Sequence, residues 1–172
     1  QLNRSLNWQK ILRKVALVMS LCAPLMAVMP MSATAATASS SSSSSIAKVP
    51  VNPFPITIQA ENFTSMFGVQ NEINKDIGGC LNTGYLHAGD WMSYSGTTVN
   101  VPVTGQYKVT FRVASAGGGS TFSFAEADNS VVYDTSVVPK TGGDQVWTDV
   151  TRTITLSAGA HSFRVNILTR TT

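Results

Sequence analysis

The chain has 172 residues, of which 43% are hydrophobic and 12% charged, so it is long enough for one globular domain with extensions. Its formal net charge of +3 comes from the N-terminus, because Arg4, Lys10, Arg13 and Lys14 all lie within the first fourteen residues. Without these four, 8 of the 12 basic residues remain against 9 acidic ones, a net charge of −1. This balance excludes a phosphate-binding face, and we expect no nucleic-acid partner.

Residues 1–35 have the composition of a secretory signal peptide. The basic residues up to Lys14 are followed by the apolar run Val15–Met29 and then by small residues up to Ala35. The run contains Pro24 and is shorter than the ~20 apolar residues of a membrane-spanning helix, which favours a cleaved signal over a single-pass anchor. We therefore expect cleavage after Ala35, a secreted protein, and no membrane association after cleavage.

Residues 36–55 are predicted to form a linker. They contain an unbroken serine run, Ser39–Ser45, which is followed by Pro50, Pro53 and Pro55. Such a stretch cannot bury enough apolar area to fold, so it behaves as a flexible tether that stiffens toward its C-terminal end. Tethers of this kind usually let an exported module move independently of its neighbour.

Residues 56–172 alternate between apolar and polar positions in short runs separated by Gly, Asn, Asp and Pro. In Gln106–Ala114 and Ser162–Leu168 the odd-numbered positions are apolar, so one face of each strand is expected in a core and the other in solvent. Further strands are predicted at Ile56–Ala60, Val69–Glu72, Trp91–Val101, Thr121–Ala127, Val131–Val138 and Trp147–Leu156. About eight or nine strands indicate an all-β fold, a β-sandwich of the jelly-roll type.

The run Asn82–Tyr94 combines aromatic rings with amides, hydroxyls and carboxylates. Proteins use this mixture to bind the apolar faces and polar edges of sugars. Strand alternation places Trp91 and Ser93 on the face opposite Met92. A tryptophan on a polar face is either an exposed sugar platform or a ring packed beneath a loop, and spacing alone favours the packed ring.

An enzyme is the weaker interpretation. A glycoside hydrolase needs two carboxylates on either side of the bond that it cleaves, and sequence alone cannot pair the available candidates. The chain has only two histidines, and His161 follows Gly159 in a predicted turn, where a solvated loop histidine is expected. The carboxylates considered lie on separate predicted strands: Glu61, Glu72, Asp90 and Glu126.

Four segments resemble, in order and spacing, the successive motifs of family 6 carbohydrate-binding modules: Ile58–Phe63, Gly68–Glu72, Gly84–Trp91 and Thr141–Trp147. The resemblance covers the chain from about Ile56 to its end. It implies a jelly roll that binds a polysaccharide of the β-glucan, xylan or agarose class without catalysis, usually attached to a secreted glycoside hydrolase. The alternatives are a free-standing lectin-like adhesion domain and, less favoured, a glycoside hydrolase in its own right.

The resemblance also implies two sites for carbohydrate. In the loops at one edge of the sandwich, Tyr85 matches the first of two aromatics that grip a sugar, and Glu72 matches a polar residue beside it. The place of the second aromatic holds Asp144, which either weakens binding or accepts hydrogen bonds from sugar hydroxyls. On the sheet face that some relatives use instead, Trp91 matches the platform and Ser93 lies two residues further along the same face.

A structural calcium is a further implication, with ligands at Gln59 and Glu61 near the first strand of the domain. Calcium takes several oxygen ligands, which carboxylates and carbonyls at strand ends supply. The alternative is that Glu61 simply pairs with a nearby Arg or Lys. The resemblance finally implies a last strand beyond Thr172. We therefore expect that this sequence lacks that strand and that a neighbouring strand edge is exposed.

Overall fold

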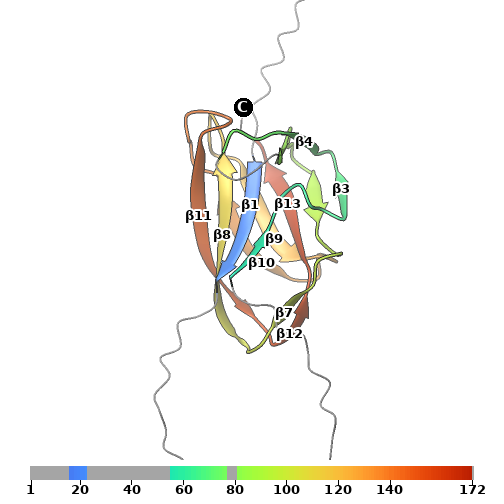
Figure 1. The fold of residues 1–172 in the computed structure, drawn as a ribbon. Coiled ribbons are helices and arrows are strands. Elements are labelled where there is room, and N and C mark those ends of the chain that lie inside the picture. The colour runs from blue at the N-terminus through green and yellow to red at the C-terminus, as the bar shows by residue number, and fades with distance from the viewer. Residues whose placement is uncertain (1–15, 23–54, 77–80, 172) are drawn as a thin grey trace, which may run out of the picture.

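The computed structural model describes residues 16–22, 55–76 and 81–171, and every regular element in these ranges is a strand (Figure 1). The predicted signal peptide and linker lie outside the described residues, apart from 16–22 and Pro55. Within the described ranges, the chain has no helix with the length and apolar character of a membrane span. The prediction of an all-β fold is confirmed.

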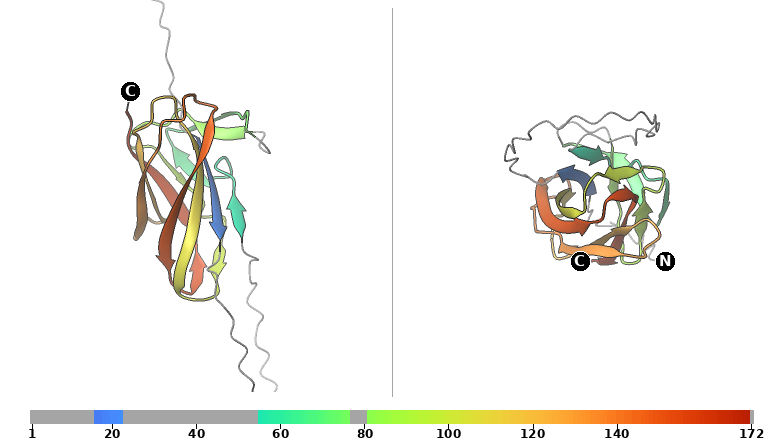
Figure 2. Two further views of the ribbon diagram at one scale, coloured as in Figure 1. Left: turned by 90° about the vertical axis from the view of Figure 1, so that its left-hand side faces the viewer. Right: turned by 90° about the horizontal axis from the view of Figure 1, so that it is seen from below.

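The strands build a sandwich of two main sheets that run along the same long direction of the molecule (Figure 2). Sheet A has the order β11 (Trp147–Leu156), β8 (Gly105–Ala114), β1 (Ala16–Cys22) and β2 (Ile56–Ile58). Sheet B has the order β10 (Val132–Val137), β9 (Thr121–Glu126), β13 (Phe163–Thr169), β6 (Trp91–Ser93) and β3 (Ser65–Phe67).

Two short strand pairs lie at opposite ends of the sandwich (Figure 1). At one end β4 (Gln70–Ile73) pairs with β5 (Leu81–Gly84), and at the other β7 (Val99–Val101) pairs with β12 (Gly159–His161). Of the residues predicted for the loop edge, Glu72 lies on β4 and Tyr85 directly follows β5. The main sheets therefore act as a scaffold that fixes this hairpin at one end.

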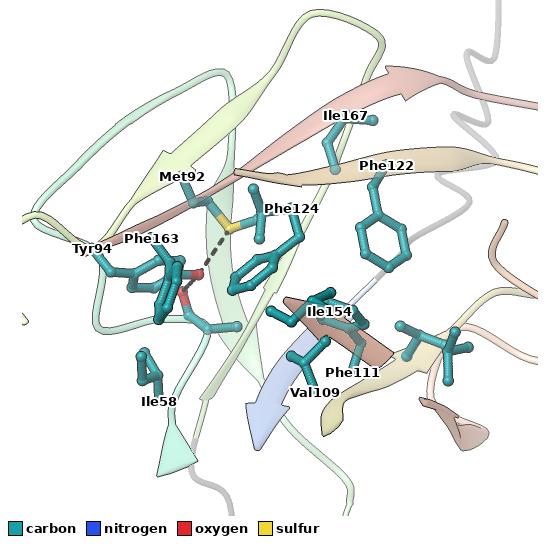
Figure 3. Close-up of a cluster of buried hydrophobic side chains, with 14 of the residues drawn as sticks. Ile58, Met92, Tyr94, Val109, Phe111, Phe122, Phe124, Ile154, Phe163 and Ile167 are labelled. Atoms are coloured by element: carbon teal, nitrogen blue, oxygen red, sulfur yellow. Dashed lines mark hydrogen bonds between the residues drawn. The ribbon is translucent and has the colours of Figure 1, made fainter. Parts of the chain in front are cut away.

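Phenylalanines from both sheets fill the centre of the core (Figure 3). Phe111 of β8 packs edge-on against Phe122 and Phe124 of β9, with ring centroids 5.0 and 5.4 Å apart. The ring of Phe163, on β13, lies 4.7 Å from that of Phe124. The edge contacts of Phe111 with Phe122 and Phe124 join the two sheets and add to the hydrophobic effect of burying these rings. The odd-numbered inward positions predicted for β8 and β13 are confirmed.

The strand predicted over Trp91–Val101 is instead two strands. A turn closes after β6, where the amide of Thr97 donates to the Tyr94 carbonyl over 2.9 Å and the amide of Gly96 donates to Thr64 Oγ1 over 2.7 Å. The chain therefore leaves sheet B at Ser93 and forms β7 at the end of the sandwich. The prediction of one continuous strand here was wrong, because the alternation of apolar and polar residues does not reveal the turn between the two strands.

His161 is buried and not solvated, which corrects the prediction of a loop histidine. Only 7% of its surface is exposed, because it ends β12 and points toward the core. Its Nδ1 contacts the Glu126 carboxylate, its Nε2 lies 2.9 Å from the Ser157 carbonyl, and Tyr133 donates to Glu126. These partners satisfy a polar group that would otherwise be costly to bury.

Strand β1 lies inside the segment predicted as a signal peptide. It runs antiparallel to both neighbours, with seven residues paired to β8 from Ala16 opposite Ala114 to Cys22 opposite Lys108. On its other side it pairs with β2. Both edges of β8 are consequently paired in sheet A, one by β11 and one by β1.

Candidate functional site

Glu72 is the centre of a polar network at the loop edge. The register of β4 and β5 places Glu72 opposite Asn82, and Oε1 of Glu72 accepts a hydrogen bond of 3.0 Å from Asn82 Nδ2. Gln145, from the loop before β11, places its Nε2 3.3 Å from the same oxygen and 3.2 Å from Asn82 Oδ1. Two amides from separate segments therefore orient one carboxylate. Charge-assisted hydrogen bonds of this kind are stronger than neutral ones.

Tyr85 directly follows this hairpin in a left-handed backbone conformation, with φ of +61°. A residue other than glycine adopts that conformation at a cost of about 1–3 kcal/mol, and such strain gathers at functional sites. The residue before it, Gly84, leaves room for the network, because a Cβ there would lie 2.9 Å from Glu72 Oε1. The structure thus brings the turn that carries Tyr85 against the carboxylate of Glu72.

Asp144 is half-buried and faces another loop. Its Oδ1 accepts a hydrogen bond of 3.2 Å from the amide of Ala116, while Thr141 Oγ1 donates to the Ser115 carbonyl over 3.0 Å. These bonds tie the loop before β11 to the loop after β8. The residue that reaches Glu72 from this loop is Gln145, which the sequence prediction missed. Its signal was an amide side chain directly after the Gly-Gly-Asp turn.

Trp91 lies on the outer face of sheet B, as alternation predicted, since its neighbour Met92 is fully buried on the opposite face. Ser93 shares the outer face but is only 4% exposed. The Trp91 ring is half-buried, and the guanidinium carbon of Arg164 lies 4.1 Å from the ring centroid. One face of the indole is therefore occupied by a cation.

Phe67 is the aromatic on this face that the sequence prediction missed. It is paired with Trp91 across β3 and β6, so the two side chains share a face, and it is 62% exposed. It was missed because the three residues of β3 are too few to show alternation. Phe67 supplies the exposed apolar surface that Trp91, stacked beneath Arg164, offers only in part.

Two of the carboxylates considered for catalysis, Asp90 and Glu126, are held by neighbouring groups. Asp90 accepts a hydrogen bond of 2.6 Å from the amide of His87, and a Cβ at Gly68 would lie 1.8 Å from its Oδ1. Glu126 is bound by His161 and Tyr133 in the interior. Asp90 thus shapes the turn after Tyr85, and Glu126 stabilises the core.

Glu61 has one carboxylate oxygen that a bound cation would satisfy. Its Oε2 is buried and has no hydrogen-bond partner among the described residues, whereas buried polar atoms are normally paired. Burial and, secondarily, the negative charge of Glu61 raise the pKa of Tyr94, whose hydroxyl donates to the Ala60 carbonyl over 3.0 Å. An oxygen of this kind fits a cation such as calcium.

Neutral oxygens near Glu61 are available as further donors for such a cation. Within the described part of the chain, no three or more His, Cys, Asp or Glu side chains are grouped so that they could hold a metal ion. Gln59 is half-buried two residues before Glu61, and its carbonyl accepts a hydrogen bond of 3.0 Å from the amide of Asn62. Amide and carbonyl oxygens are suitable calcium ligands, so the donor set is compatible with calcium.

Comparison with protein families gives a match of residues 59–171 to carbohydrate binding module family 6. The matched range contains β3 to β13 and therefore both the loop edge and the outer face of sheet B.

Individual proteins give the same result. The module CBM6cm-2 from Cellvibrio mixtus lichenase 5A, in complex with cellotriose, is 47% identical with a TM-score of 0.62, over 63% of this chain and 83% of that one. The C-terminal module of LamC, a marine laminarinase from Zobellia galactanivorans, is 38% identical with a TM-score of 0.60. The match covers 65% of this chain and 87% of that one. The clotting factor G alpha subunit of Tachypleus tridentatus is 33% identical over 64% of this chain, which spans only 16% of that protein.

Proposed function

The chain belongs to carbohydrate-binding module family 6, and from this premise we propose that it binds a β-glucan at the loop edge without hydrolysing it. The single observation that carries the proposal is the Glu72–Asn82–Gln145 network beside the strained Tyr85. The relative in complex with cellotriose supports a glucan over the xylan or agarose that the sequence left open.

The loop edge contains the two kinds of group that sugar binding needs. The ring of Tyr85 offers an apolar face for stacking on the C–H groups of a sugar. The Glu72 carboxylate accepts hydrogen bonds from sugar hydroxyls, each worth about 1.5–3 kcal/mol because the acceptor is charged. Because Asn82 and Gln145 already hold that carboxylate in place, little ordering entropy is lost on binding.

Asp144 leaves the site with one stacking surface for a sugar in place of two. With a carboxylate where relatives are expected to carry a second aromatic, the sugar stacks on one face only. Since an aromatic contact is worth about 0.5–1.5 kcal/mol beyond its buried area, we expect weak binding to single sugars. Longer oligosaccharides gain additional contacts and are the better ligands.

The module is further proposed to be secreted and to hold an attached glycoside hydrolase on its substrate. Residues 36–55 act as a tether in this proposal, and binding raises the effective concentration of the enzyme at the polysaccharide. A free-standing lectin-like adhesion domain would use the same loop edge. The sequence of the gene beyond codon 172 distinguishes these two.

Calcium is proposed as a structural ion at Glu61, with Gln59 as a second side-chain ligand. Glu61 precedes β3, which forms the edge of sheet B. When bound, the ion would neutralise the carboxylate, whose Oε2 is buried, and hold this segment against the sandwich. No step of carbohydrate binding depends on it.

Affinity electrophoresis tests the proposed function. We expect the chain to migrate more slowly in native gels that contain soluble mixed-linkage β-glucan or laminarin, and less so with arabinoxylan or agarose. Assays of reducing-sugar release on the same polysaccharides should show no turnover. Unchanged migration in all four gels, or release of reducing sugar by the purified chain, would refute the proposal.

A further inference from the structure

Arg164 is distinguished from other arginines of the described chain by its partners. Arg112 makes a two-fold contact with Asp76, with Nε–Oδ2 2.7 Å and Nη2–Oδ1 2.9 Å, and Arg152 lies 3.7 Å from Asp134. Arg164 instead donates from Nε to the neutral amide oxygen of Asn166 over 2.6 Å and stacks on Trp91. Among the described residues no carboxylate is paired with it.

The surroundings of this guanidinium are neutral across the sheet. The residues opposite it in the register are Ser93 on β6 and Ala125 on β9. Asn166 is itself engaged, since its Nδ2 donates to Ser123 Oγ over 3.1 Å and to Asn129 Oδ1 over 3.0 Å. Burial lowers the pKa of Arg164, with no acidic neighbour to oppose this effect. A half-buried cation therefore has its charge uncompensated within the described part of the molecule.

We propose that the outer face of sheet B binds an anionic sugar, a uronic acid residue of a polysaccharide, with Arg164 as the group that selects the carboxylate. The charge is complementary, and an arginine pairs with a planar carboxylate through two parallel N–H donors. Nε is already bonded to Asn166, so the two terminal nitrogens are the donors, and stacking on Trp91 limits how far the fork turns.

The same face offers an apolar surface for the sugar ring. Phe67 is 62% exposed and lies opposite Trp91, and β3 is separated from β13 by one strand. Adjacent strands are spaced about 4.8 Å apart, so Phe67 and Arg164 lie on strands about 10 Å apart. An exposed ring beside a positioned cation matches an acidic polysaccharide better than a neutral one.

This inference rests on the proposed function, in that it takes the chain to bind polysaccharide, but it concerns a different face. The test compares glucuronoxylan with the same polymer after reduction of its carboxyl groups, so that only the charge differs. Isothermal titration calorimetry of the full chain should give about tenfold tighter binding to glucuronoxylan, since a hydrogen-bonded charge is worth that much or more.

Three variants test whether Arg164 causes the preference for glucuronoxylan over the reduced polymer. Arg164→Gln should abolish it, and Arg164→Lys, which keeps the charge but not the planar fork, should retain only part of it. Lys108→Gln is the control, because it removes one positive charge from an exposed position on sheet A and should leave the preference unchanged. Thermal unfolding of each variant verifies that the fold is intact.

Different experimental results would contradict binding of an acidic sugar at sheet B and binding of β-glucan at the loop edge. Equal binding of the two xylans overturns the inference, while continued retardation by β-glucan leaves the proposed function standing. An equal loss in Lys108→Gln overturns it as well, because the effect would then be general electrostatic attraction. Tighter binding to a sulfated xylan than to glucuronoxylan would overturn the assignment of a carboxylate as the selected group.

Discussion

At the scale of single residues, Glu72 and Glu61 have opposite surroundings. Glu72 is oriented by two amides, Asn82 and Gln145, at the loop edge. Glu61 has a buried oxygen without a hydrogen-bond partner in the described part of the chain. A carboxylate held at a surface can accept hydrogen bonds from a ligand, whereas a buried, unsatisfied one favours a cation.

Gln145→Ala tests the orientation of Glu72. The change removes the contacts of the Gln145 amide nitrogen with Glu72 and Asn82 and the hydrogen bond that its oxygen accepts from the Lys75 amide. We expect cello-oligosaccharide binding to weaken by about five- to tenfold, which corresponds to about one net hydrogen bond. Calorimetric titration measures the loss. Gln106→Ala is the matched control, because Gln106 is exposed on β8, and it should bind like the unmodified chain. Equal affinity of the two variants would contradict a role for Gln145.

Calcium removal tests Glu61. We expect a chelator to lower the thermal unfolding temperature of the chain and added calcium to restore it, because ligand binding to the folded state stabilises it. Glu61→Gln should unfold at the same temperature with and without chelator. If the chelator leaves the unfolding temperature of the unmodified chain unchanged, calcium is not a structural ion of this chain.

At the scale of elements, alternation predicted long strands well and short ones poorly. In β8 and β13 the inward rows follow the sequence, and the predicted bounds of β11 agree with the structure. Strands β3 and β12 have three residues each, which is too short for a periodic signal, so Phe67 and the buried His161 could not be placed.

The contacts of the loop edge could not be predicted from sequence periodicity either. Gln145 and Glu72 are brought together by tertiary packing over 73 residues of sequence. The family resemblance predicted Tyr85 and Glu72 as site residues but did not point to the amides that orient Glu72. A local pattern cannot reveal such pairs, because long-range register is set by the packing of the sheets.

Strand β1 leads to a prediction about stability. Deletion of residues 1–35, as in the expected cleaved form, removes the strand between β2 and β8 and leaves seven residues of β8 without their partner. With about seven backbone hydrogen bonds to β8 lost, each worth about 0.5–1.5 kcal/mol net, we expect the free energy of unfolding to fall by about 4 kcal/mol or more. Urea denaturation of the two chains measures the difference.

A peptide with the sequence of β1, added to the shortened chain, supplies a control for that prediction. A synthetic peptide of residues 16–22 should restore part of the stability of the shortened chain by pairing in the same place. A scrambled peptide of the same composition should have no effect. Equal stability of the long and short chains would contradict a contribution of β1 to sheet A.

At the scale of the whole molecule, the sandwich presents two surfaces with different chemistry. The loop edge has a carboxylate and an aromatic, which suits the hydroxyls of a neutral glucan. The outer face of sheet B has an arginine and an aromatic, which suits an acidic sugar. A module with both would bind two kinds of chain in a mixed cell wall and gain avidity when both are present.

The most direct test of glucan binding at the loop edge is a nuclear magnetic resonance titration with cellotriose. We predict that the backbone amide signals of Glu72, Tyr85 and Gln145 shift in a saturable manner, whereas those of β7 and β12, at the opposite end of the sandwich, stay unchanged. No shift at the loop edge, or shifts confined to the opposite end, would contradict the account.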